Sequence, residues 1–442
     1  MKTRMNFKDE FYQKLKLLVL PIAIQNFMLA LVSATDAIML GWIDQTSLSA
    51  VSLAGQVQFV LSLFISGIAA GAGIMAAQYW GKQDAASIEK VIPIALRTNL
   101  LFSGLFTILA GFCPEMLMRI FTNDAPLVAS GSQYLRAVAL SYVLCGISQV
   151  YLILLKNTGH AAVSSRISST AVVLNIILNA ILIYGLCGAP ALGIRGAAYA
   201  TVAARVVELI WAYLETKKPE RVRILWNRLF SSAGKILSED FWRYTLPVLA
   251  ASLVWGIAYV LYSVIMGHMG SDAVAANSIT SIAKSLLSCL IRGVSGGAGV
   301  LIGNLLGANE LEKAREYGGR LSHLSIAIGI VTGGLLMLIS PAIVHFAPLS
   351  DTAAEYLQYM LLFCGLNLMA QSVNTTVLDG IFCAGGDAKF DMQGNIGAMW
   401  CFSVPLGFLA AFWLKLPVMV VYCIVNLDEI VKLPAVYHHY KK

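Results

Sequence analysis

Twelve runs of apolar residues, separated by short loops, constrain this chain more than any other feature of its sequence. About 20 residues suffice to cross a bilayer as a helix, and each run reaches that length. Only 12% of the residues are charged, against about 25% in a soluble domain. The runs also lack the ten-residue alternation of an outer-membrane barrel. We therefore predict an all-α polytopic membrane protein with twelve transmembrane helices, at 15–41, 48–80, 91–113, 131–156, 164–186, 191–214, 241–267, 273–306, 319–346, 354–383, 393–414 and 417–436.

Basic residues lie in every second loop, and the intervening loops contain only Arg119 and Lys415. The positive-inside rule then places both termini and the long 215–240 linker in the cytoplasm. Six spans precede this linker and six follow it, so we predict an N-lobe at 1–214 and a C-lobe at 241–442. The net charge of +7 is explained by these loops, and we expect no nucleic-acid partner.

The two halves of the chain repeat each other. Pro21 aligns with Pro247 at an offset of 226 residues, and the register holds without a gap to Gly81 and Gly307. Because each half has an even number of spans, the repeat is parallel, and we predict two six-helix bundles related by a pseudo-twofold axis along the membrane normal. Such duplications are typical of transporters. The glycines that match in this register indicate close helix packing: Gly67 with Gly293, Gly71 with Gly297, and Gly73 with Gly299.

The first span carries a carboxylate, Asp36, some 20 residues after Lys16. This spacing puts Asp36 about 30 Å further along a helix axis, with no cation within one turn. A carboxylate inside the bilayer costs several kcal/mol unless it faces a partner, water or a transported ion. We favour a functional acid over the alternative of a hydrogen bond that joins helices.

Two amides on the fifth span, Asn175 and Asn179, are four residues apart and share one helix face. Thr201 on the sixth span adds a hydroxyl at a similar depth. Such oxygens suit a hard cation such as Na⁺ when a carboxylate completes the shell. Hydrogen bonding between helices is the alternative for these amides.

The C-terminal half differs, because Tyr262 stands at the position equivalent to Asp36. The eighth span carries Lys284 and Arg292, and the deeper one, Arg292, needs a partner. Four acids are candidates for pairing with it: Asp379, Asp391, Asp428 and Glu429. We favour a structural ion-pair cluster, in which Lys432 pairs with Asp428, over a gate or anion site.

Three aromatic residues of the seventh span, Trp255, Tyr259 and Tyr262, form one stripe. Packing is the usual role of such a stripe; the alternative is a cavity wall that binds flat cations. No P-loop, GxSxG, HExxH or CxxC motif occurs, and the eight cysteines lack metal-ligand spacing. We predict a protein that is not an enzyme, needs no cofactor, and draws any energy for transport from an ion gradient.

Several motifs together resemble the multidrug and toxic compound extrusion (MATE) family: TDAIMLGWI in the first span, GIAAGAG and QYWGKQD around the end of the second, GIRGAAYATV in the sixth, and CAGGDAKF after the tenth. The likeness covers nearly the whole chain. The chain resembles a bacterial, DinF-like member of the family in the inner membrane. This resemblance implies export of organic, often cationic, compounds in exchange for Na⁺ or H⁺ by alternating access.

The resemblance also implies roles for particular residues. The family's N-lobe cation site falls on Asp36, Asn175, Asn179 and Thr201. Many relatives have a second acid where this chain has Asn179, so a two-acid proton relay is not expected. The seventh-span acid of other relatives is replaced here by Trp255. Pro21 resembles a bend proposed to couple ion binding to the cavity; the alternative is a proline at the start of a helix with no mechanical role.

The substrate cavity or gate is predicted at Pro21, Trp255, Tyr259, Tyr262, Arg292, Asp379 and Glu429. We expect a monomer whose partners are small organic substrates and the lipid bilayer. Two other functions stay open. A flippase of lipid-linked precursors would use Lys284 and Arg292 for an anionic headgroup, and a membrane receptor or enzyme would need a larger region outside the membrane than this chain offers.

Overall fold

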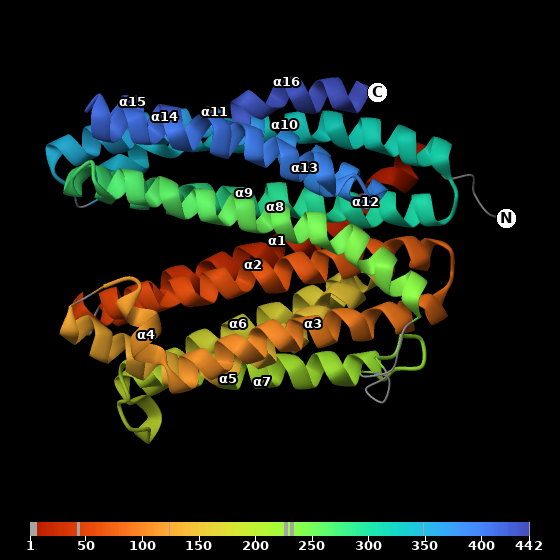
Figure 1. Cartoon of the computed structure of the whole chain (residues 1–442), viewed down its shortest axis with the longest axis horizontal. Coiled ribbons are helices and arrows are strands. Elements are labelled where there is room, and N and C mark those ends of the chain that lie inside the picture. The colour runs from red at the N-terminus through yellow and green to blue at the C-terminus, as the bar shows by residue number, and fades with distance from the viewer. Residues whose placement is uncertain are drawn as a thin grey trace. The chain divides into compact units, whose positions relative to one another are not determined.

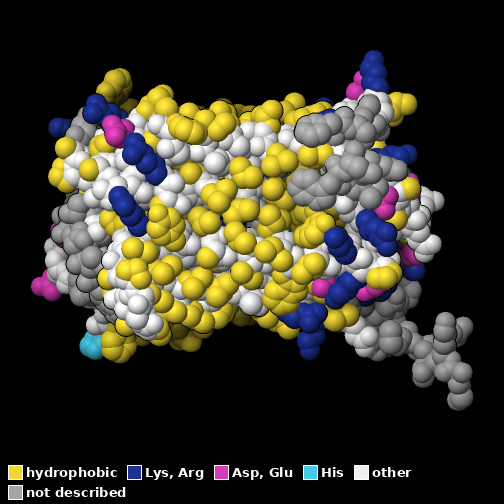
Figure 2. All heavy atoms as spheres, turned by 90° about the horizontal axis from the view of Figure 1, so that it is seen from below, with side chains coloured by type: hydrophobic (Ala, Val, Ile, Leu, Met, Phe, Trp, Pro, Cys, Tyr) yellow, Lys and Arg dark blue, Asp and Glu magenta, His cyan; other side chains and the backbone are white. Residues whose placement is uncertain are grey.

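The computed structural model describes residues 7–41, 45–122, 124–224, 229, 234–347 and 349–441, so part of the predicted 215–240 linker lies outside the described residues. Within these ranges the chain is helical and contains no strand. On the face drawn in Figure 2, hydrophobic side chains cover the middle, while charged side chains gather toward the two ends. A surface that faces lipid has this distribution, because charges are costly in the hydrocarbon.

Ten stretches of the described residues are long and apolar enough to cross a membrane. One of them, Ala125–Tyr184, contains two predicted spans, because the backbone turns at Thr158 and at Gly159, whose φ is +82°. The last predicted span is broken at Asn426, so its two pieces are each too short to be counted. The all-helical membrane fold is confirmed. One stretch holds two predicted spans and the broken last span is not counted, so the ten stretches correspond to the twelve predicted spans.

Two compact units divide the chain: residues 27–249 form one, and residues 1–26 with 250–442 form the other. We call them the first and the second unit. The division falls inside two long helices, α1 (Phe7–Gly41) and α8 (Lys235–Gly267). The early parts of these helices therefore group with the lobe that lies opposite in the predicted scheme.

The first unit consists of the later part of α1, the early part of α8 and the elements between them, whose larger helices run side by side in Figure 1. These elements are α2 (Gln45–Gly81), α3 (Ala85–Phe112), α4 (Pro114–Arg119), α5 (Ala125–Leu155), the π-helical turn η1 (Lys156–His160), α6 (Ala161–Tyr184), η2 (Leu186–Gly188) and α7 (Ile194–Thr216). Helix α3 begins after Asp84, whose carboxylate accepts the backbone N–H of Ser87 at 3.0 Å.

The second unit contains the remaining parts of α1 and α8 and the elements that follow. These are α9 (Ser271–Gly307), α10 (Leu311–Phe346), α11 (Asp351–Thr375), η4 (Thr376–Phe382), α12 (Cys383–Gly385), α13 (Ala388–Asn395), η5 (Ile396–Ser403), α14 (Val404–Phe408), η6 (Leu409–Trp413), α15 (Val418–Val425) and α16 (Asp428–Lys441). The tenth and eleventh spans thus contain π-helical segments, which often mark functional or strained positions in a helix.

The repeated glycines lie where helices touch. In the first unit, a Cβ added at Gly71 of α2 would be 2.7 Å from the Cα of Thr245 on α8. In the second unit, a Cβ added at Gly297 of α9 would be 2.9 Å from a methyl carbon of Val19 on α1. Position 19 is the repeat equivalent of position 245, so each unit contains the same seam, and the packing role predicted for these glycines is supported.

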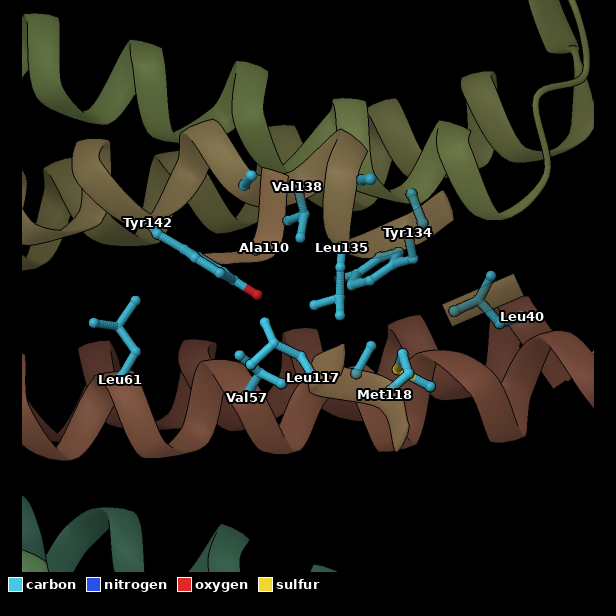
Figure 3. Packing of buried hydrophobic residues seen from close by; sticks show 14 of the residues in the cluster. Leu40, Val57, Leu61, Ala110, Leu117, Met118, Tyr134, Leu135, Val138 and Tyr142 are labelled. Atoms are coloured by element: carbon cyan, nitrogen blue, oxygen red, sulfur yellow. The ribbon is translucent and has the colours of Figure 1, made fainter. Parts of the chain in front are cut away.

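The core of the first unit lies between α2 and α5. Figure 3 shows Leu135, Val138 and Tyr142 on α5, with Val57 and Leu61 on α2. All five side chains are buried. This apolar core holds α2 and α5 together and fixes the position of the neighbouring cavity.

Candidate ion-coupling site

Asp36 lies on the part of α1 that belongs to the first unit, and it is partly buried. One of its carboxylate oxygens accepts a hydrogen bond from the side-chain amide of Asn179 at 2.6 Å. Asn179 is fully buried on α6. A charge-assisted bond of this length is among the strong hydrogen bonds of proteins, so the amide holds the carboxylate in one orientation.

The hydrogen bonds continue from Asn179 to the other predicted ion-coupling residues. Asn179 also donates to the side-chain oxygen of Asn175 at 3.3 Å, and Asn175 donates to the hydroxyl of Thr201 at 3.3 Å. Thr201 donates in turn to the carbonyl of Ala197, one turn earlier on α7. The structure therefore brings Asp36, Asn175, Asn179 and Thr201 into one continuous chain.

Local sequence explains why α6 and α7 present these groups together. The two helices form a hairpin in which the backbone N–H of Leu192 donates to the carbonyl of Leu182 at 2.8 Å. Gly196 then packs its backbone directly against Leu182, where any side chain would clash. The hydroxyl of Tyr184, the last residue of α6, donates to the carbonyl of Met39 on α1 at 2.7 Å. This bond fixes α1 against the end of α6.

The donor set fits a hard monovalent cation. Asp36 supplies a carboxylate, while Asn175 and Thr201 supply neutral oxygens, which is the ligand type that such ions prefer. The side-chain oxygen of Asn179 is buried and has no hydrogen-bond partner among the described residues. A buried acceptor without a partner is costly, so this oxygen is available to a cation or to a proton donor.

Asp36 borders a cavity of about 450 Å³ in the first unit, a size typical of small-molecule sites. Its wall is mainly apolar, and the polar lining residues are Asp36, Ser52, Gln58, Ser62, Tyr134, Asn175, Thr201, Arg205 and Glu208. Asp36 is thus not sealed in packed protein. A solute in this cavity would lie beside its carboxylate.

Two charged residues of this cavity, Arg205 and Glu208, were not identified from the sequence. One terminal nitrogen of Arg205 lies 3.0 and 2.8 Å from the two carboxylate oxygens of Glu208. Glu208 is almost fully buried and also accepts a hydrogen bond from Ser148 of α5 at 2.6 Å. The signal was present, because two opposite charges three residues apart in the sixth span are unusual inside a bilayer.

The predicted aromatic stripe does not behave as one surface. Trp255 and Tyr259 stack with their ring centroids 5.6 Å apart, and Tyr259 is 40% exposed. Tyr262, in contrast, is buried in the apolar core of the second unit. None of the three lines the cavity beside Asp36.

The predicted acids and bases of the C-terminal half divide into two groups. Glu429 accepts a hydrogen bond from Asn374 at 2.8 Å and lies 3.4 Å from Lys432. Lys432 also lies 3.7 Å from Asp428, as its spacing predicted. These side chains are buried and paired.

Arg292 and Asp379 are exposed on the second unit and form no ion pair with each other, although both belong to the described residues. Asp379 lies on η4, which packs closely on α9 beside Ser295. Lys284 donates to the side-chain oxygen of Asn367 at 2.8 Å. The predicted cluster therefore forms around Lys432 and does not include a pair between Arg292 and Asp379.

Pro21 lies well inside α1, which begins at Phe7. The alternative is therefore wrong in placing Pro21 at the start of a helix, and the mechanical role of Pro21 stays a prediction. A proline in the interior of a helix removes one backbone hydrogen bond and crowds the preceding turn. The repeat-equivalent Pro247 is likewise inside α8, so both long helices carry the same weak point.

Two segments, residues 21–181 and 247–409, match the sequence profile of the MatE family. The chain is 21% identical to the probable multidrug resistance protein YoeA of Bacillus subtilis, over 99% of this chain and 95% of that protein. It is 25% identical to the probable multidrug resistance protein NorM of Agrobacterium fabrum, over 86% and 83%. Its fold is similar to a solved MOP superfamily transporter from Pyrococcus furiosus, with a TM-score of 0.87 and 20% identity over 97% of this chain and 94% of that one.

Proposed function

Because the chain belongs to the MatE family, whose profile matches both of its halves, we propose that it is a cation-coupled antiporter. It exports organic, cationic compounds across the bacterial plasma membrane in exchange for Na⁺ or H⁺, and it works as a monomer with both termini in the cytoplasm. One observation carries the proposal: Asp36 lies at the border of a cavity while Asn179 holds its carboxylate. The family's relatives are transporters, which also supports a role that is not enzymatic.

The cavity has the chemistry that an organic cation requires. Its wall combines Phe59, Tyr134 and aliphatic side chains with the carboxylate of Asp36. Aromatic faces attract cations, and the apolar wall accepts the rest of an organic molecule. In the second unit, Lys284 is already bonded to Asn367, which leaves the exposed Arg292 as the cation that an anionic cargo would meet.

In the proposed cycle, the coupling ion and the cargo use the same carboxylate in turn. When the site is open to the outside, the incoming cation binds Asp36 and neutralises it, and the organic cation leaves. After the return to the inward-facing state, the ion dissociates and new cargo enters. The oxygens of Asn175, Asn179 and Thr201 would complete the shell of Na⁺, whereas a proton would need Asp36 alone.

Coupling requires that the ion bind one conformation more tightly than the other, since equal affinity shifts no equilibrium. To convert a state populated at about 1% into one populated at about 99%, the difference in affinity must be about 10⁴-fold, or about 5.5 kcal/mol. A buried carboxylate with oriented neutral oxygens can provide such a difference, provided that its shell is complete in only one state.

The experiment that tests the proposal is dye efflux in everted membrane vesicles under separately imposed Na⁺ and H⁺ gradients. We expect one gradient to drive efflux by the natural protein. The Asp36→Asn variant should show only the rate measured without a gradient, at a normal protein level. Glu355→Gln, which makes the same chemical change at an exposed position of α11, is the matched control and should behave as the natural protein does.

Full gradient-driven efflux by Asp36→Asn would remove the carboxylate from the coupling mechanism. A natural protein that responds to neither gradient would refute cation coupling altogether. Both results leave the fold and the family assignment intact.

A further inference from the structure

The charges that line the cavity of the first unit do not balance. The cavity is bordered by residues of α1, α2, α5, α6 and α7, and three of its lining residues carry a formal charge: Asp36, Arg205 and Glu208. The residues that line it from α2, α5 and α6 are uncharged, with Tyr134 as the only phenol among them. With all three groups ionised, the lining has a net charge of minus one.

The geometry shows which carboxylate is neutralised. Arg205 approaches both oxygens of Glu208, at 3.0 and 2.8 Å, and Ser148 adds a further donor to Glu208. Asp36, in contrast, receives only the neutral amide of Asn179 among the described side chains that bond to it. The uncompensated charge therefore belongs to Asp36.

Arg205 and Glu208 share a face of α7 with Thr201, because positions 201, 205 and 208 are separated by about one helical turn each. The ion pair is thus placed in the same cavity as the hydrogen-bond chain that starts at Asp36. Charges that line one cavity of about 450 Å³ interact through a medium of lower dielectric constant than water. A change in the pair would be felt at the ion-coupling carboxylate without any contact with it.

We propose that the Arg205–Glu208 ion pair sets the charge of the cavity at minus one and thereby limits transport to one monovalent cation per cycle. The inference rests on the proposed function, since it assumes that Asp36 binds the coupling ion. Arg205 neutralises Glu208 and so keeps it from acting as a second cation-binding acid. Of the two acids that line this cavity, only Asp36 then binds a cation.

A purely structural role is the competing explanation, because Ser148 and Glu208 also join α5 to α7. The two roles differ in what they predict for paired substitutions. If the pair sets the charge, replacing both residues restores the net charge of minus one and should restore cation binding. If the pair only joins helices, the double variant should be at least as defective as either single variant.

The test uses full-length protein, purified and reconstituted in proteoliposomes, as the natural sequence, as four variants of the ion pair and as Asp36→Asn. Cation binding is measured as thermal stabilisation by NaCl, with N-methylglucamine chloride keeping ionic strength constant, and separately by proton titration. The coupling number is measured as the ion gradient that just balances an opposing substrate gradient. Size-exclusion profiles establish that each variant is folded.

Removing the acid alone, in Glu208→Gln, leaves Arg205 uncompensated and the cavity neutral. The apparent affinity for the coupling cation should fall at least about tenfold, the size of effect that one nearby charge produces at intermediate dielectric constant. Removing the base alone, in Arg205→Gln, leaves two acids, and the coupling number should rise above one. Arg205→Lys keeps the charge and should keep a coupling number of one.

The decisive comparison is the double variant R205Q/E208Q, in which both charges are absent. We expect its cation affinity to return to within about threefold of the natural value, because the net charge near Asp36 is again minus one. A double variant that binds no better than Glu208→Gln overturns the proposal, as does unchanged affinity in Glu208→Gln itself.

Failure of this proposal can be separated from failure of the proposed function. Asp36→Asn removes the coupling acid in every background, so retained coupling in that variant refutes the function. Lost coupling in Asp36→Asn together with no rescue in R205Q/E208Q refutes only the role of the ion pair.

Discussion

The seam between α2 and α8 predicts a graded response to the smallest substitution, glycine to alanine. In Gly71→Ala, the new Cβ would lie 2.7 Å from the Cα of Thr245, whereas carbon atoms prefer about 3.5–4.0 Å. The two helices must separate by roughly 1 Å to relieve the contact. Since the obstacle is backbone and cannot rotate away, we expect a cost toward the upper end of the about 1–3 kcal/mol typical of overpacking.

Two other glycines provide matched comparisons. At Gly297, the repeat equivalent of Gly71, the nearest atom is a methyl carbon of Val19 at 2.9 Å. That side chain can adjust, so Gly297→Ala should cost about 1 kcal/mol or less after the helix-propensity gain of about 1 kcal/mol. At Gly104, in the middle of α3, nothing lies within 4 Å of a new Cβ, and alanine should stabilise the helix by up to about 1 kcal/mol.

The assay is the midpoint of thermal unfolding of each purified variant in one detergent, at one protein concentration. The expected order of stability is Gly104→Ala first, Gly297→Ala second and Gly71→Ala last. A Gly71→Ala midpoint equal to or above that of Gly104→Ala would refute the close approach of α2 and α8, and with it the structural reason for the repeated glycines.

Two further predictions concern single hydrogen bonds. The pKa of Asp84 lies below its ordinary value of 3.8, because its carboxylate accepts two hydrogen bonds from Ser87. The larger effect comes from the hydroxyl and the smaller one from the backbone N–H. The stabilisation of α3 by Asp84 should therefore be complete above that ordinary pKa and be lost as pH falls through the lowered one. Asp84→Ala should cost about 0.5–1 kcal/mol at neutral pH and nothing at the lowest pH, as thermal midpoints measured against pH would show; an equal cost at every pH would contradict the capping role. Tyr184→Phe removes the 2.7 Å hydrogen bond to the carbonyl of Met39. We expect the free energy of unfolding to fall by about 0.5–1.5 kcal/mol and hydrogen exchange in the later part of α1 to become faster. Unchanged exchange there would show that this bond does not hold α1.

The sequence was sufficient to predict the helices and the four residues of the hydrogen-bond chain. Helix-length apolar runs have few alternatives in a bilayer, and the spacing of Asn175 and Asn179 places both amides on one face. The proximity of Asp36 and Thr201 to those amides came from the resemblance, because residues more than 20 positions apart are brought together only by tertiary packing. The ion-coupling role of these residues stays a prediction.

Other features depend on contacts that no pattern in one sequence encodes. The early parts of α1 and α8 group with units that a division at the linker does not indicate, since hydropathy gives the length of a helix and not its neighbours. Arg205 and Glu208 follow Thr201 by about one and two turns of α7, and their spacing in the sequence does not show that they line the same cavity as Asp36. The three aromatic residues of α8 do not form a single surface. Their helical spacing gives them a common face, but burial along that face varies from one turn to the next.

The asymmetry of the two halves has a physical consequence for where coupling can occur. The repeat would place an acid at position 262, but Tyr262 is buried in the apolar core of the second unit. The buried acids Asp428 and Glu429 of that unit lie within 3.4–3.7 Å of Lys432. A carboxylate that is already paired gains little from binding another cation, because it must first give up its partner. Asp36 is bonded to a neutral amide and borders a cavity, so a cation that reaches it displaces no other charge. This supports the proposed placement of ion coupling in the first unit.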